Sequence, residues 1–191
     1  MTQPSLTTSR LVLRPFVAGD AAMVQRLAGA REVADTTLSI PHPYEDGMAE
    51  AWFATHAPAF DRGEMATLAV TASSAGLVGA IGLRIERDHR RAELGYWIGV
   101  PYWGRGFATE AAKAVIRFGF EQLSLNRIHA CHLTRNPASG RVMIKAGMRL
   151  EGCLRQHVVK WDRFEDLAKY AILRREWTAE APEKAALRGR S

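Results

Sequence analysis

Cysteine is scarce in this chain of 191 residues, where only Cys131 and Cys153 occur. Two cysteines are too few for a disulfide framework, and their spacing is not that of a zinc knuckle. His129 and His132 stand beside Cys131, but on a strand His132 points to the opposite face from the other two. Because a structural metal site needs four convergent ligands, we expect no metal cofactor.

Long apolar runs are also missing. No stretch approaches the roughly 18 apolar residues of a membrane span, and residues 1–5 lack the basic and apolar regions of a signal peptide. We therefore expect a cytoplasmic protein without a membrane partner. The composition, 47% hydrophobic and 24% charged, is that of a folded globular domain. We expect one domain over residues 1–178 and a flexible tail over residues 179–191.

Basic residues exceed acidic ones, giving a formal net charge of +6. No basic run is interleaved with stacking aromatic residues, and part of the excess lies in the tail at Lys184, Arg188 and Arg190. We therefore expect no direct nucleic-acid partner. A positive surface is equally able to steer a polyanionic cofactor toward its site.

Some segments of the chain have the two-residue hydrophobic period of strands and others have the helical period. Together they predict a mixed α/β domain of the α+β class. Period-two patterns predict strands at residues 10–16, 65–71, 77–85, 92–100, 127–134, 150–159 and 167–177. Helical periods predict about four helices, at residues 20–27, 46–61, 108–123 and 137–147. The strand, helix, strand order over residues 92–134 requires a crossover and hence two locally parallel strands.

The most informative stretch is the turn within residues 98–110, which joins a predicted strand to a helix. Gly104 and Gly106 allow the main chain to approach a ligand closely, and the start of the helix leaves amide donors unpaired. A phosphate or pyrophosphate suits such a site. The stretch matches neither the dinucleotide-binding fingerprint nor the P-loop, and an ordinary turn is the alternative.

A second recognisable helix start follows the next predicted strand. Asn136 is a preferred N-cap residue, and Pro137 is preferred at the first helical position. Gly147 ends this helix about three turns later. Joined by the crossover, the two helix starts lie beside the pair of parallel strands.

Together these stretches resemble the GNAT N-acetyltransferase superfamily, in particular its ribosomal-protein N-terminal, RimJ/RimL-like branch. The resemblance covers about residues 9–177 and is sharpest at residues 92–98, 102–111 and 136–148. It implies a twisted, mixed, mostly antiparallel sheet, in which a central pair of parallel strands at 92–100 and 127–134 splays apart. It also implies acetyl-CoA as cosubstrate, bound in the split, and an amine as acceptor.

The same resemblance implies which residues hold acetyl-CoA. The pyrophosphate meets the amides of residues 105–109, and the pantetheine pairs with the strand edge at Ile98 and Val100, as a pseudo-strand would. The full set is Ile98, Gly99, Val100, Trp103, Gly104, Arg105, Gly106, Phe107, Ala108, Thr109, Asn136 and Ser139. Two positions depart from the broad family: Trp103 replaces a usual Gln or Arg, and Met143 replaces a tyrosine that acts as general acid.

Attack of an amine on a thioester needs a base, an oxyanion donor and a donor for the leaving thiolate. The resemblance makes the backbone N–H of Ile98 the oxyanion donor. Glu93 is the candidate base, acting through water, and a substrate contact. Alternation places Glu93 and Ile98 on opposite faces unless a bulge intervenes near Gly95. The alternative is that Glu93 is a surface ion-pair partner of Arg91 or Arg127.

Ser139 is the candidate catalytic hydroxyl facing the thiolate. The alternative is that Ser139 only satisfies an amide in the first helical turn, as Asn136 does if it acts purely as N-cap. Tyr44 and Tyr96 are candidates for contact with the acceptor, although Tyr96 is equally suited to be a wall of the pocket.

The sequence therefore predicts N-acetylation of a primary amine, foremost a protein N-terminal α-amine. An aminoglycoside, a polyamine or an amino acid is an alternative acceptor, and a non-catalytic acyl-CoA sensor is an alternative of another class. Acidic residues around the acceptor mouth would favour a cationic small molecule. Residues 31–50 offer Glu32, Asp35, Glu45, Asp46 and Glu50. A homodimer is possible.

Overall fold

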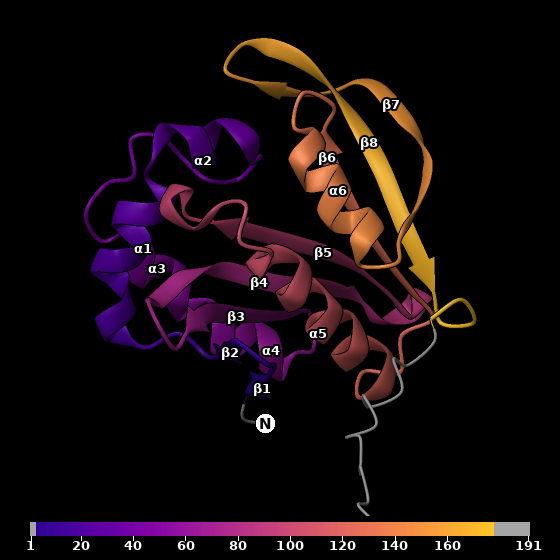
Figure 1. Ribbon diagram of the computed structural model, residues 1–191, viewed down its shortest axis with the longest axis horizontal. Helices are drawn as coiled ribbons and strands as arrows, with labels where there is room; N and C mark the ends of the chain where they lie inside the picture. Colours follow the sequence, from indigo (N-terminus) through magenta and orange to yellow (C-terminus); the bar gives the residue numbers. More distant parts are fainter. Residues whose placement is uncertain (1–2, 178–191) are drawn as a thin grey trace, which may run out of the picture.

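The computed structural model describes residues 3–177, so the tail expected at 179–191 lies outside the described residues (Figure 1). The strands are β1 Leu6–Thr7, β2 Leu11–Arg14, β3 Met65–Ala72, β4 Gly76–Glu86, β5 Arg91–Ile98, β6 Arg127–Leu133, β7 Arg149–Lys160 and β8 Arg163–Leu173. The α-helices are α1 Ala21–Ala28, α2 Arg31–Thr36, α3 Met48–Ala54, α4 His56–Asp61, α5 Phe107–Glu121 and α6 Pro137–Lys145.

All the described strands join one eight-stranded sheet in the order β1-β2-β3-β4-β5-β6-β8-β7. The pairings are antiparallel except that between β5 and β6, which α5 joins by a crossover. This parallel pair is short, since its register covers only Arg91, Ala92 and Glu93 of β5. Beyond Glu93 the two strands separate, so the sheet is split at its centre. The predicted fold is confirmed in these respects.

Helices cover both faces of the sheet, because its strands bury apolar side chains on both sides. Leu68 and Val70 of β3 belong to a large cluster that includes the apolar faces of α5 and α6. Ala69, between them, belongs to a second cluster with α1 and α3. Neighbouring residues of a strand point to opposite faces, so the two clusters lie on opposite sides of the sheet.

The α-helices number six over residues 3–177, compared with about four helices expected. The helix expected over 46–61 is divided into α3 and α4, because Pro58 has no N–H and its ring conflicts with the carbonyl of Ala54. The additional helix α2 has no side-chain cap and is held by burial of Val33 and Ala34. Short helices of this kind depend on tertiary packing, which a local pattern does not contain.

No helix within residues 3–177 combines the length and the apolar character needed to cross a membrane.

Candidate active site

The splitting of β5 from β6 leaves backbone groups of β5 free to bind a ligand. The N–H of Gly99 donates to the carbonyl of Val78 in β4 at 2.9 Å. Backbone groups alternate in direction along an antiparallel strand, so the N–H and C=O of Ile98 point the other way, toward β6. At Ile98 the strand β6 is no longer paired with β5. The N–H of Ile98 is therefore free to donate to an extended ligand, whereas its carbonyl accepts from the indole of Trp103.

The turn after β5 presents a second set of free donors. Gly104 and Gly106 have φ values of +74° and +80°, which favour glycine. Gly106 is the N-cap of the 15-residue helix α5 and supplies no side-chain cap. The first helical hydrogen bond is the N–H of Glu110 to the carbonyl of Gly106. The amides of Phe107, Ala108 and Thr109 are thus available to an anion.

Contacts from the segment between β1 and β2 fix this turn. The Glu110 carboxylate accepts from the hydroxyl of Thr8 at 2.6 Å and from the backbone N–H and Nε of Arg10 at 2.9 and 2.7 Å. Arg10 Nη1 also donates to the carbonyl of Arg105 at 3.0 Å. Burial alone would raise the pKa of Glu110, but these hydrogen bonds, together with that from Ser9, lower it. The Glu110 carboxylate and Arg10 therefore form an ionic anchor that fixes the position of the turn.

Trp103 contacts the exposed edge of β5 directly. Its indole Nε1 donates to the carbonyl of Ile98 at 2.6 Å. This contact explains why tryptophan is accommodated at a position where many relatives are expected to carry Gln or Arg. It also satisfies the carbonyl of Ile98, which points away from β4.

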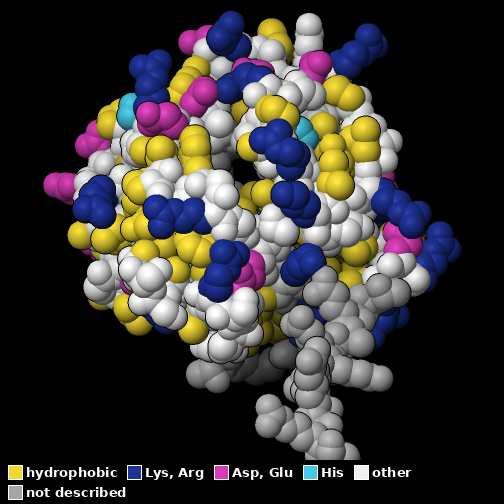
Figure 2. Space-filling view, viewed as in Figure 1, with side chains coloured by type: hydrophobic (Ala, Val, Ile, Leu, Met, Phe, Trp, Pro, Cys, Tyr) yellow, Lys and Arg dark blue, Asp and Glu magenta, His cyan; other side chains and the backbone are white. Residues whose placement is uncertain are grey.

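Basic side chains lie on the face of the molecule that α5 and α6 occupy (Figure 2). Figure 2 shows an opening near the centre of the face on which α5 and α6 lie, with Lys and Arg side chains around it. The basic residues of these two helices are Lys113, Arg117, Arg141 and Lys145. Such a surface favours the approach of a polyanion.

The start of α6 lies across the split from β5. Asn136 is its N-cap, and the side-chain oxygen of Asn136 accepts from the N–H of Ser139 at 3.4 Å. The hydroxyl of Ser139 is not used in this way, because its Oγ lies 2.7 Å from the hydroxyl of Tyr96. Tyr96 also donates to the carbonyl of Ser139 at 3.0 Å. The N-cap role of Asn136 is thus present, and the Ser139 hydroxyl is directed at β5.

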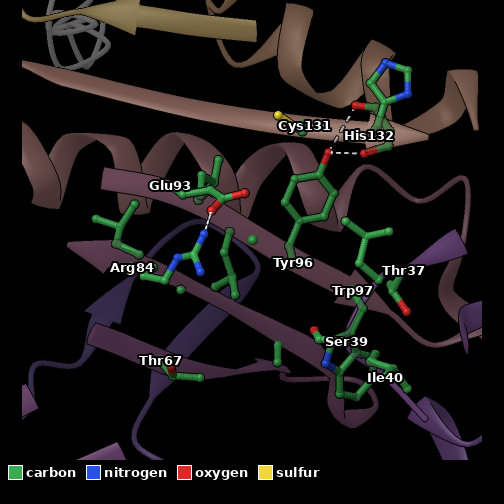
Figure 3. Close-up of a pocket in the computed structure, with 18 of the residues that line it drawn as sticks. Thr37, Ser39, Ile40, Thr67, Arg84, Glu93, Tyr96, Trp97, Cys131 and His132 are labelled. Atoms are coloured by element: carbon green, nitrogen blue, oxygen red, sulfur yellow. Dashed lines mark hydrogen bonds and ion pairs between the residues drawn. The ribbon is translucent and has the colours of Figure 1, made fainter. Parts of the chain in front are cut away.

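A single cavity of about 600 Å³ connects the two faces of β5 (Figure 3). On one side Tyr96, Ser139 and Met143 line it. On the other side its walls include Glu93 and the segment 36–40. Figure 3 shows the Tyr96 ring directed toward the strand that carries Cys131 and His132, whereas Glu93 meets Arg84. A ligand in the cavity can contact both Glu93 and the Tyr96–Ser139 pair.

Glu93 forms an ion pair, but with a partner that sequence reasoning missed. Its carboxylate binds Arg84, which lies directly opposite on β4. The two partners expected from sequence bind other carboxylates, since Arg91 pairs with Glu86 and Arg127 pairs with Glu151. The ion pair stands within the cavity lining, so Glu93 faces both Arg84 and any bound acceptor.

The bulge considered near Gly95 is absent, because the β4–β5 register runs without a shift from Arg91 to Ile98. Glu93 and Ile98 therefore point their side chains to opposite faces. This alternation of side chains does not prevent the Glu93 carboxylate and the backbone N–H of Ile98 from contacting the same ligand. The group of Ile98 that the sequence analysis singles out is its backbone N–H, which lies in the plane of the sheet and points away from β4.

On the Glu93 side, the floor of the cavity carries few side-chain atoms. Thr67, Gly82 and Gly95 are cross-strand neighbours on β3, β4 and β5, and all three line the cavity. No atom lies within 4 Å of the position that a Cβ of Gly95 would occupy. Tyr44 is not part of the lining and packs with the second cluster. Its contact with an acceptor stays a prediction.

Cys131 and His132 also line the cavity. The thiol of Cys131 is half-buried, and burial raises its pKa, which disfavours the reactive thiolate. His132 is buried, and its Nδ1 lies 2.8 Å from the carbonyl of Leu133. Within residues 3–177 no group of three or more His, Cys, Asp or Glu side chains is placed to hold a metal ion.

Residues 10–149 match the acetyltransferase (GNAT) domain family. The chain belongs to the GNAT acetyltransferase family. The predicted family is thereby confirmed, and with it the fold of a split, mostly antiparallel sheet. The match includes β5, the turn before α5 and the start of α6, and it covers every residue of the cavity lining except Leu167.

Individual relatives agree with this membership. The chain is 40% identical over 99 residues to the uncharacterized N-acetyltransferase YoaA of Bacillus subtilis, covering 51% of this chain and 56% of that protein. It is 34% identical over 96 residues to the ribosomal-protein-serine acetyltransferase of Escherichia coli, covering 50% and 54%. The matched region thus spans about half the length of these relatives. The latter similarity supports the RimJ/RimL-like branch.

A solved structure extends the similarity over nearly the whole chain. The GNAT-family acetyltransferase from Bacillus anthracis superposes with a TM-score of 0.79 at 26% identity, covering 90% of this chain and 99% of that one. The arrangement of the split sheet and its helices is therefore that of the GNAT family.

Proposed function

We propose that this protein transfers the acetyl group of acetyl-CoA to a primary amine, and that the amine is the α-amine of a protein N-terminus. One observation carries the proposal: a single cavity brings a carboxylate, Glu93, and a hydroxyl, Ser139, to opposite sides of the same strand edge. Direct transfer needs both groups, one to receive the proton of the amine and one to stabilise the departing thiolate.

The residues around the split fit acetyl-CoA. The uncapped N-terminus of α5 suits the pyrophosphate, and the unpaired N–H of Ile98 on β5 suits a carbonyl of the pantetheine arm. When bound, acetyl-CoA supplies an activated acetyl thioester. The assigned contacts are those predicted from sequence: residues 98–100 for the arm and residues 103–109 for the phosphates, with Asn136 and Ser139 at the far side of the split.

In the proposed reaction a neutral amine enters from the face that carries Glu93. Glu93 receives the proton of the amine, directly or through a water molecule, and Arg84 fixes the direction of the carboxylate. The new C–N bond places negative charge on the carbonyl oxygen, and the N–H of Ile98 stabilises it. The C–S bond then breaks, and its electron pair leaves with the sulfur.

The charge of the cavity favours a single amine over a polycation. Among the described residues that line the cavity, Glu93 is the one carboxylate, and it is already paired with Arg84. Asp35 binds Arg135, and Asp46 accepts from Gln25. Acceptors such as polyamines and aminoglycosides carry several ammonium groups, each of which is stabilised by an opposite charge. A peptide with one free α-amine needs no further carboxylate.

The proposal is tested by thiol release from acetyl-CoA with a panel of acceptors. The panel contains peptides with one free α-amine and no lysine, an amino acid, a polyamine and an aminoglycoside. We expect the highest kcat/KM with a peptide. Highest turnover with a polyamine or an aminoglycoside would contradict the proposed acceptor. Tight CoA binding without release for any acceptor would instead indicate the acyl-CoA sensor.

Glu93→Gln tests the base. The amide keeps the size of the side chain but cannot accept a proton, so we expect kcat to fall by about 100-fold or more. Glu86→Gln is the matched control, because it removes a carboxylate from an exposed ion pair with Arg91 on the neighbouring strand. Turnover of Glu93→Gln equal to that of Glu86→Gln at every pH would remove Glu93 from the mechanism.

A further inference from the structure

Two hydroxyl groups meet at the part of the cavity that faces the split. The phenol oxygen of Tyr96 lies 2.7 Å from Oγ of Ser139 and 3.0 Å from the carbonyl oxygen of the same residue. Tyr96 comes from β5 and Ser139 from the first turn of α6, and both line the cavity. Among the described residues, no other hydroxyl is bonded to Ser139. The pair therefore spans the split.

The hydrogens of the pair allow two arrangements. The carbonyl of Ser139 can only accept, so in the first arrangement Tyr96 donates to it and the hydroxyl of Ser139 donates to the oxygen of Tyr96. In the second arrangement Tyr96 donates to Oγ of Ser139, which frees the hydrogen of Ser139 for another acceptor. The two arrangements differ only by rotation about two C–O bonds. No heavy atom moves between them.

We propose that Tyr96 is a positioning residue, which turns the hydroxyl of Ser139 toward the sulfur that leaves when the acetyl group is transferred. This inference rests on the proposed function. While the thioester is intact, its sulfur is a weak acceptor, and Ser139 stays bonded to Tyr96. When the C–S bond breaks, the sulfur becomes an anion and attracts the hydrogen of Ser139, and Tyr96 donates to Oγ in its place.

The position normally filled by a general acid supports this role. Met143, which stands where many GNAT members have a tyrosine on this helix, is 1% exposed and has no proton to donate. Tyr96 brings a phenol to the same helix from β5 instead. Its contact with Ser139 leaves a serine hydroxyl, rather than a phenol, facing the sulfur.

The pair stabilises the thiolate without giving up its proton. Burial raises the pKa of Tyr96 to about 12, although the hydrogen bond with Ser139 opposes this shift. An ordinary thiol has a pKa of about 8.5, so a proton transfer from Tyr96 to the thiolate is disfavoured by a factor of about 10³. The electron pair of the C–S bond thus stays on sulfur, which receives its proton from solvent. The proton of the amine leaves through Glu93.

A double-mutant cycle tests the inference with steady-state kinetics of Tyr96→Phe, Ser139→Ala and the double variant. We expect kcat to fall about 10-fold in Tyr96→Phe and about 10- to 100-fold in Ser139→Ala. The double variant should be no slower than Ser139→Ala, because Tyr96 acts only through Ser139. The KM for acetyl-CoA should stay within about twofold in all three. Tyr170→Phe, which removes a phenol outside the cavity, should behave as wild type.

The pH profile gives a second readout. Because Tyr96 stays protonated, wild-type kcat should show no fall attributable to it up to about pH 10. A falling limb that disappears in Tyr96→Phe would show direct proton donation and would overturn the positioning role. Additive losses in the cycle, or loss of CoA binding by Tyr96→Phe in calorimetry, would also overturn it.

The failures of the two proposals are distinguishable. No thiol release by the wild type with any acceptor would overturn the proposed function and this inference with it. Normal release by the wild type and equal kcat in Tyr96→Phe would overturn this inference alone.

Discussion

Glu93 and Tyr96 stand three positions apart on one strand and serve opposite sides of the cavity. The sequence predicts Glu93 as a base and Tyr96 as an acceptor contact or a wall of the pocket. Their partners are not foreseeable, because Arg84 meets Glu93 through strand register and Ser139 meets Tyr96 through packing of α6. Gly95 lies between them and leaves the floor of the cavity open.

Gly95→Val should therefore obstruct the acceptor and spare acetyl-CoA. Valine suits a strand, so the fold is retained, but its methyl groups enter the space that the acceptor needs. We expect the acceptor KM to rise about 10-fold or more and the KM for acetyl-CoA to stay within about twofold, measured by two-substrate kinetics. Gly152→Val is the matched control, because Gly152 also faces open space but lies outside this cavity. Equal kinetics for the two variants would contradict the placement of the acceptor.

The turn and helix α5 form the element that sequence predicts best. Its glycines and helix start are local features, and the structure differs from the expected helix only at its ends, with Phe107–Glu121 in place of 108–123. What holds the turn is not local. Thr8 and Arg10, about 100 positions away in sequence, bind Glu110 in the first turn of α5. A local sequence pattern around α5 therefore does not reveal these hydrogen bonds to Glu110.

Glu110→Gln should destabilise the protein and weaken CoA binding. The carboxylate accepts charge-assisted hydrogen bonds from Arg10, and their loss costs about 1–3 kcal/mol of the free energy of unfolding. Because the pKa of Glu110 is lowered on folding, this stabilisation is complete above the unfolded-state pKa and is lost as pH falls. Urea unfolding of both proteins should therefore differ near neutral pH and converge in acid. A difference that is constant with pH would contradict the ionic anchor.

For the whole molecule, the sequence predicts most strands and the longer helices, because these elements carry strong hydrophobic periods. The split of the sheet came from resemblance to the family, since no period reveals where β5 and β6 part. The sequence does not predict the contacts that hold the segment around residues 35–40, part of which lines the cavity. Arg135 joins Asp35 of α2 to Glu165 of β8, and Lys160 donates to the carbonyl of Ile40 at 3.5 Å. These contacts join segments up to 120 positions apart, so only the folded chain brings them together.

The central claim is that an amine from the Glu93 face meets the acetyl group held in the split. Mass spectrometry of a peptide with one free α-amine and one internal lysine, incubated with acetyl-CoA and the protein, tests it most directly. We predict acetylation of the α-amine, slowed about 100-fold or more in Glu93→Gln and about 10-fold in Tyr96→Phe. Acetylation confined to the lysine side chain, or no acetylated peptide while a polyamine is modified, would contradict the account.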